Sequence, residues 1–154
     1  AMSSRKQVRD TFAELARGHV TDAQRVYPLT ADDERVTQPF DFSGESPVIV
    51  VASAGSERQQ LTFRGSAPIY YLDVHLFVRA TGIDGSGNTV GVADLDDTLD
   101  DLEHAVGTLI SAAQNGEHWT AISYDGRSRA EFLTVLDGTE HKREIIPLKI
   151  TARL

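Results

Sequence analysis

The segment from Tyr70 to Arg79 constrains the fold more than any other part of the sequence. Its residues alternate between an apolar set and a mixed set. Successive side chains of a β-strand point to opposite faces of a sheet, so this alternation predicts one long strand. The apolar set is Tyr70, Leu72, Val74, Leu76 and Val78. We therefore expect a sheet with one face on the hydrophobic core.

A leucine-rich stripe between Ala93 and Gln114 is the second strong pattern. Its apolar residues recur every three or four positions, which predicts an amphipathic helix that packs on the sheet. They are Leu95, Leu99, Leu102, Val106, Leu109, Ile110 and Ala113. Aspartates crowd the first half of the segment, where the helix dipole favours carboxylates. We expect Asn115-Gly116 to end this helix in a left-handed turn.

A shorter helix is predicted near the start of the chain, from Ser4 to Arg17. Its apolar residues fall at helical spacing, Ser4 is the candidate N-cap, and Gly18 is the candidate stop. The segment 19–47 that follows is polar and contains several prolines. We expect a long loop or arm there, with at most one short strand near 25–29. Loops of this length in compact domains are usually functional or disordered, so this arm is a candidate contact region.

The other apolar segments predict further strands. A β-branched segment at 48–53 indicates a strand covered on both faces, and 59–64 alternates before a turn at 65–68. The last third of the chain adds three alternating segments, at 119–124, 129–136 and 142–154. Asp-Gly pairs at 125–126 and 137–138 are typical of hairpin turns, so we expect these three strands to form a meander.

The order of the predicted elements indicates an α+β fold. We expect a mainly antiparallel sheet, with the long helix and the shorter N-terminal helix packed on it. The length of 154 residues fits a single domain, 4–154. In the last strand Pro147 removes one hydrogen-bond donor of the ladder, which indicates an edge position or a bulge at that point.

Composition argues against several classes of function. The sequence contains no cysteine, so neither disulfides nor thiol chemistry are possible, and this suits a reducing cytoplasm. A net charge of −8 opposes nucleic-acid readout, and no apolar segment approaches the ~20 residues that cross a bilayer. The five histidines lack metal-binding spacing, and no nucleophile motif or P-loop is present. We therefore expect no catalytic residues, no cofactor and no metal.

Two segments have a weak likeness to cation sites. Residues 84–90 resemble the middle of an EF-hand loop, but the carboxylates required at its first and twelfth positions are missing, so a flexible turn is favoured. In the long helix, Asp96 with Asp100 and Asp97 with Asp101 form i,i+4 pairs. Such pairs could hold a divalent ion or share a proton. A solvated helix surface is the ordinary interpretation of the same aspartates.

The mixed face of the 70–79 strand is the candidate surface for protein contact. A helix or a second subunit could cover it, and burial under the first helix is the alternative interpretation. The tentative interface combines this face with two residues of the glycine-rich loop 82–91. It consists of Tyr71, His75, Phe77, Arg79, Asp84 and Asn88. Trp119, which starts a strand, is expected in the core.

The element order and two sequence segments resemble the tail-terminator and minor tail proteins of long-tailed bacteriophages. The resemblance spans 70–154. It depends on the long strand, the glycine-bearing loop, the striped helix, the segment from Trp119 to Ile122, and the ending KREIIPLKI from Lys142 to Ile150. Proteins of this family are structural virion proteins without catalytic residues.

The resemblance implies an α+β subunit that forms a homohexameric ring at the head-proximal end of the tail, after assembly in the host cytoplasm. Such a ring caps the tail tube protein, ends tail polymerisation and provides the surface on which head completion or connector proteins dock. DNA passes through it without specific binding, and no membrane is involved. Two alternatives stay open: a head–tail connector subunit, or a small ligand-binding α+β domain. An enzyme with a pocket around Tyr71, Asp73, His75 and Arg79 comes third.

Overall fold

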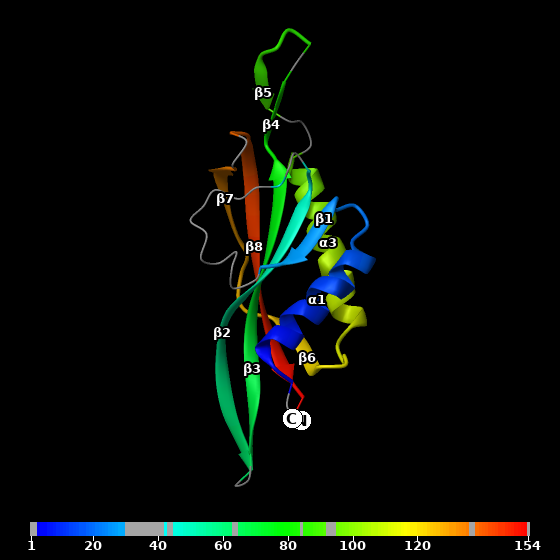
Figure 1. Cartoon of the computed structure of the whole chain (residues 1–154), viewed down its shortest axis with the longest axis vertical. Coiled ribbons are helices and arrows are strands. Elements are labelled where there is room, and N and C mark those ends of the chain that lie inside the picture. Colours follow the sequence, from blue (N-terminus) through cyan, green and yellow to red (C-terminus); the bar gives the residue numbers. More distant parts are fainter. Residues whose placement is uncertain are drawn as a thin grey trace.

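Two helices lie on one face of a six-stranded mixed sheet (Figure 1). The computed structural model describes residues 3–29, 42, 45–62, 65–83, 85–91, 95–135 and 138–153. The helices are α1 (Arg5–His19) and α3 (Leu95–Ala112). In sheet order the strands are β1 (Arg25–Pro28), β2 (Val48–Thr62), β3 (Gly65–Arg79) and β8 (Glu140–Ala152), with β6 (Trp119–Tyr124) and β7 (Arg129–Thr134) both beside β8. The expected α+β class is confirmed.

Helix α1 begins where the sequence predicts and continues beyond its predicted end. The amide of Gln7 donates to Ser4 Oγ at 3.1 Å, and the amide of Ser4 donates to Gln7 Oε1 at 2.8 Å, which together form a capping box. Gly18 as the stop is wrong: the helix continues through it, and the cap is Val20, whose amide donates to Ala16 O. Gly18 lies in the helix with open space around it.

The stripe of α3 is buried against the sheet as expected, but its end differs from the prediction. The helix ends at Ala112, and Gly116 does not adopt the left-handed conformation. A Cβ on Gly116 would lie 2.5 Å from Cε2 of Trp119, so a glycine is needed there to admit the indole ring. Trp119 is fully buried, which confirms its core position, and its Nε1 donates to Ala113 O at 2.7 Å.

Strands β2 and β3 form one long hairpin. The strand predicted at 48–53 and the described part of the strand predicted at 59–64 join into β2, with a register shift between Ser53 and Gly55; residues 63–64 lie outside the described part. The turn predicted at 65–68 is wrong, because these residues pair with β2 as the first part of β3. Pro68 is tolerated there because pairing of β3 with β8 begins only at Ile69, so its missing N–H leaves no ladder donor absent.

The last three strands do not form the predicted meander. β6 and β7 are not paired with each other in the described sheet; β6 pairs with the second half of β8, and β7 pairs with its first half. Pro147 lies between the two stretches, where its carbonyl accepts from the amide of Asp125 at 2.9 Å. The N atom of Pro147, which has no hydrogen to donate, therefore faces the gap between the stretch of β8 that pairs with β6 and the stretch that pairs with β7. Gly126, at φ 86, lies between two strands that run in the same direction along β8, so the hairpin turn predicted at 125–126 is wrong. Gly138, also at φ 86, closes the β7–β8 hairpin as expected.

Apolar side chains are buried on both faces of the sheet. The larger cluster lies between the helices and the sheet and contains the alternating apolar set of β3. A smaller cluster lies on the opposite face and consists of Phe42, Val48, Val50, Phe77 and Val135. The segment 48–51 contributes to both clusters and is fully buried, which confirms a strand covered on both sides.

The two loop predictions fall partly on described residues. Within 19–47, the short strand is confirmed as β1, which runs parallel to β2; residues 30–41 and 43–44 lie outside the described part. The glycine-rich loop forms a small hairpin of β4 (Thr81–Ile83) and β5 (Thr89–Gly91). Gly87 adopts φ 81 at its tip. Figure 1 shows β4 and β5 at one end of the molecule, and the end of β2 and the start of β3 at the other.

Candidate functional site

The sheet face opposite the helices contains most of the predicted interface residues. We call it the bare face and define it by the side chains of β3, β8 and β7 that share a face with Phe77. Among them are Tyr71, Asp73, His75, Phe77, Arg79, Arg143, Arg129 and Glu131. The alternative that α1 covers this face is wrong, because Val8 and Phe12 of α1 pack on the other face with Leu72.

One half of the bare face is closed by apolar side chains of the same chain. Phe77 is fully buried, and the ring of Phe42 lies on it with centroids 4.7 Å apart. Val135 completes the cover from the end of β7. Phe77 is therefore part of a second small core, and its ring is not on the surface of this subunit.

His75 lies at the border between this apolar half and a charged half. Its ring stacks on Phe77 at 6.1 Å with planes inclined by 10°. Burial, followed by the positive charges of Arg143 and Arg129, lowers the pKa of His75 to about 4. Its Nδ1 is buried and makes no hydrogen bond within the described residues. The imidazole is therefore neutral at physiological pH and acts as a packing side chain.

The charged half of the bare face is organised around Arg143. This guanidinium forms an ion pair with Glu131 and lies over the ring of Phe77, 5.8 Å from its centroid. Burial lowers the pKa of Arg143, and the charge of Arg129 adds to that effect. Asp73 has a raised pKa, mainly through burial, although Arg129 opposes the shift. Attraction from Arg129 is thus weaker than the loss of hydration at Asp73.

The remaining predicted interface residues are spread over two regions. Tyr71 is half-buried and its hydroxyl donates to Glu57 at 2.8 Å, an interaction that raises its pKa. Arg79 is half-buried, and its backbone amide donates to Ser46 Oγ. Asn88 is exposed in the β4–β5 hairpin, away from the bare face. Asp84 lies outside the described residues. The structure thus brings together only the predicted residues of β3.

A second group of ionisable residues lies on the helix side, where α3 meets β8. Asp100, Glu103 and Tyr124 contribute to the lining of a cleft of about 470 Å³. Glu144 of β8 faces α3 at this place. Burial, together with a hydrogen bond and repulsion from Glu103, raises the pKa of Glu144 to about 7, and a hydrogen bond with Ser128 opposes the shift. Glu144 therefore stays protonated up to near neutral pH.

The predicted aspartate pairs of α3 take different positions around this contact between α3 and β8. Asp96 forms an ion pair with Lys142 of β8 at 2.8 Å. Asp97 and Asp101 are exposed, as the solvated interpretation expects, and Asp100 adds to the negative potential at Glu144.

Glu144 was missed in the sequence, although a signal for it existed. Ile146, Leu148 and Ile150 alternate on the core side of the last strand. The same alternation places Glu144 on that side, where a carboxylate needs a partner.

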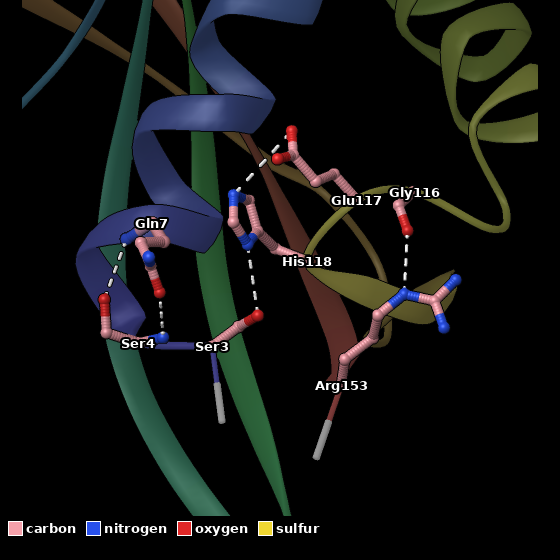
Figure 2. Close-up of polar contacts among 7 residues, drawn as sticks. All are labelled: Ser3, Ser4, Gln7, Gly116, Glu117, His118 and Arg153. Carbon is pink, nitrogen blue, oxygen red and sulfur yellow. Dashed lines mark hydrogen bonds and ion pairs between the residues drawn. The ribbon is translucent and has the colours of Figure 1, made fainter. Parts of the chain in front are cut away.

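A polar cluster near both ends of the described chain contains a serine, a histidine and a glutamate (Figure 2). Ser3 Oγ lies 3.1 Å from His118 Nδ1, and His118 Nε2 lies 4.0 Å from Glu117. Serine hydrolases instead place the serine on Nε2 and the acid on Nδ1. Backbone bonds connect Ser3 to Arg153 and Arg153 to His118. The cluster therefore connects the segment before α1, the loop before β6 and the end of β8.

Among the residues that the structure describes, no three His, Asp or Glu side chains gather closely enough to hold a metal ion. Neither described helix is both long and apolar enough to cross a membrane. No protein-family model matches the sequence, and no curated protein matches it.

Proposed function

We propose that this chain is a structural protein of the bacteriophage virion that acts as a tail terminator. It forms a ring, six copies in the related proteins, which caps the tail tube, ends tail polymerisation and presents a surface to the head completion proteins. Two arguments support the proposal: the resemblance of residues 70–154 to that family, and the geometry of the open sheet. The single observation that carries it is the match between the two outer edges of the sheet.

The two outer edges of the sheet lie at the same positions along the strand direction. Near the β4–β5 hairpin the edge strands are β1 and β7, and a row of paired residues connects them: Arg25, Val48, Phe77, Arg143 and Glu131. Nearer the tip of the β2–β3 hairpin the edge strands are β2 and β6, and the row is Ser56, Tyr70, Ile150 and Ile122. Within the described residues, each of these stretches has a strand partner on one side only.

The directions of the edge strands also match. β1 and β2 run one way, and β6 and β7 run the opposite way. Copies placed side by side in the same orientation would meet with β7 against β1 and β6 against β2, both antiparallel. Such a head-to-tail contact uses two different surfaces and closes into a ring when its rotation divides a full turn. A net charge of −8 per copy suits a ring through which DNA slides without binding.

The test is electron microscopy of phage particles assembled without this protein. We expect tails of uncontrolled length that carry no heads, and normal particles when the wild-type chain is supplied in trans. Tails of normal length without heads would instead identify a head–tail connector. Normal particles with heads attached would contradict both assignments.

The cleft beside Tyr124 is the observation that favours a ligand-binding domain as the second candidate. Its volume of about 470 Å³ falls in the range of small-molecule sites. Its lining is polar and acidic, with Asp100 and Glu103 on one wall, which would favour a small cationic ligand. A monomer whose melting temperature rises with such a metabolite would support this candidate, provided that Glu103→Gln abolishes the rise.

A further inference from the structure

The side chain of Gln114 covers the outer edge of β6. Its Nε2 donates to the carbonyl of Ile122 at 2.8 Å, and the amide of Ile122 approaches Gln114 Oε1 at 3.5 Å. One primary amide thus contacts both polar groups of one strand residue, as the backbone of a neighbouring strand would. Nε2 also donates to Ile110 O at 3.0 Å, which satisfies one of the unpaired carbonyls at the end of α3.

The backbone of Ile122 points away from the sheet, to the side where another strand could pair. Ile122 lies opposite Ile150. The neighbouring pair, Asp125 with Pro147, shows which β8 residues face this side: the Pro147 carbonyl accepts from Asp125. The backbone N–H and C=O groups of successive β8 residues point alternately towards β6 and towards β3. Those of Ile150 point towards β3, so those of its partner Ile122 point away from the sheet.

Ser56 on the opposite edge has the matching orientation. It stands in the same row as Ile122, through Tyr70 and Ile150. Val51 O accepts from the amide of Leu29, which shows that the Val51 backbone faces the β1 side. Tyr70 and its partner Ser56 follow the same alternation as Val74 and its partner Val51, so the Ser56 backbone faces the same side.

We propose that Gln114 is a removable guard of the β6 edge. In a single subunit its amide occupies the hydrogen-bonding positions at the backbone of Ile122. In the ring, the backbone of Ser56 in β2 of a second copy replaces it there. This inference rests on the proposed ring and adds which edges meet and what keeps them apart beforehand. An open sheet with an unguarded edge is a template for uncontrolled pairing. A contact that a neighbour has to displace keeps separate subunits apart and is lost when the ring forms.

The other outer edge has a comparable contact. Nε and Nη2 of Arg17 both donate to the carbonyl of Val26 in β1, at 3.1 and 2.9 Å. Pro28, in the same strand, offers no N–H to an incoming strand. Arg17 of α1 and Gln114, two residues after the end of α3, therefore each contact an outer edge of the sheet, and Gln114 engages both a donor and an acceptor.

The test compares the self-association of wild type, Gln114→Ala and Thr108→Ala by sedimentation velocity over a range of concentrations. Thr108 is the matched control, because its hydroxyl also donates to a backbone carbonyl on α3, that of His104, and not to a group of β6. We expect Gln114→Ala to raise the association constant about five- to tenfold, the scale of one lost hydrogen bond. Thr108→Ala should leave it unchanged. Circular dichroism melts verify that each variant is folded, and Gln114→Glu, which cannot donate to Ile122 O, should behave like the alanine variant.

A disulfide experiment identifies the edges that meet. Ala121 and Glu57 are exposed and flank Ile122 and Ser56, so antiparallel pairing of these two residues would bring Ala121 opposite Glu57 of a second copy. The parent chain has no cysteine. Ala121→Cys protein mixed with Glu57→Cys protein should therefore form a covalent dimer under mild oxidation, whereas Thr108→Cys mixed with Glu57→Cys should not.

The outcomes separate the guard from the ring. Equal association of wild type and Gln114→Ala would overturn the guard, even if rings form and tails are capped normally. Stronger association without the Ala121–Glu57 cross-link would overturn the assignment of β2 as the partner strand. Failure of the proposed function is recognised independently, by normal tails in particles that lack the protein.

Discussion

At the scale of single residues, burial acts on Glu144 and His75 in opposite senses. Each is moved towards its uncharged form, so the pKa of the carboxyl is raised to about 7 and that of the imidazole is lowered to about 4. The folded state therefore holds a proton on Glu144 that the unfolded state releases. It lacks one on His75 that the unfolded state takes up.

We predict that Glu144→Gln removes part of the pH dependence of stability. The folded pKa of Glu144 lies above the ordinary value of 4.5, so its contribution is complete at pH values below 4.5 and is lost as the pH rises towards 7. Glutamine keeps the uncharged state at every pH. The variant should gain on wild type between pH 5 and 8, by about 1 kcal/mol once screening by solvent is allowed for.

Urea unfolding at several pH values measures this difference. The contribution of His75 to the free energy of unfolding is lost in the other direction, as the pH falls from 6.5 to 4. Both proteins contain His75, so this contribution cancels in the difference between them. Glu140→Gln is the control, because Glu140 lies on the same strand and is exposed. Parallel stability curves for wild type and Glu144→Gln would contradict the raised pKa of Glu144.

At the scale of elements, the same glycine-to-alanine change should have opposite effects at two helix-associated positions. Gly18→Ala should stabilise the protein by about 0.5–1 kcal/mol, because Gly18 lies inside α1 with no atom near a new Cβ. Gly116→Ala should destabilise it by about 1–3 kcal/mol, because the Cβ would overlap the ring of Trp119. Thermal melts of both variants are the measurement. Effects of the same sign would contradict the placement of one glycine.

These two glycines illustrate why helix ends were the weak part of the sequence prediction. A glycine after an apolar stripe can mark a left-handed cap, a tolerated interior position or a close contact with a ring. Only the tertiary structure separates the three cases. Gly116 is fixed by Trp119, which belongs to the following strand.

Strand positions were predicted well, whereas strand partners were not. Alternation located β3, β6, β7 and β8, because the period of two is a property of each strand alone. The Asp-Gly signal at 125–126 was local, and the hairpin turn that it predicted is wrong, because β6 and β7 run in the same direction. It could not show that β8 is long enough to pair with β6 and β7 one after the other. On the bare face, alternation likewise placed Phe77, but its cover comes from Phe42, in a segment without periodic pattern.

At the scale of the whole molecule, the sheet has two outer edges without a further strand among the described residues, while each copy carries a net charge of −8. The edges that would meet in a ring contribute mainly backbone hydrogen bonds, which do not depend on ionic strength. Like-charged copies repel one another over distances comparable to the Debye length, about 10 Å at 0.1 M salt and about 3 Å at 1 M. Charge and backbone pairing therefore act in opposite directions on assembly.

This opposition predicts that salt strengthens self-association. Raising sodium chloride from about 0.1 M to about 1 M should raise the association constant of the wild-type protein, because screening weakens the repulsion between acidic subunits and leaves strand pairing intact. Sedimentation velocity at several salt concentrations measures it, and Gln114→Ala should show the same slope from a higher starting value. An interface held by ion pairs, for example between the acidic start of α3 and the arginines of the bare face, would weaken with salt instead. An association constant that falls as salt rises would therefore exclude edge pairing as the main contact between subunits.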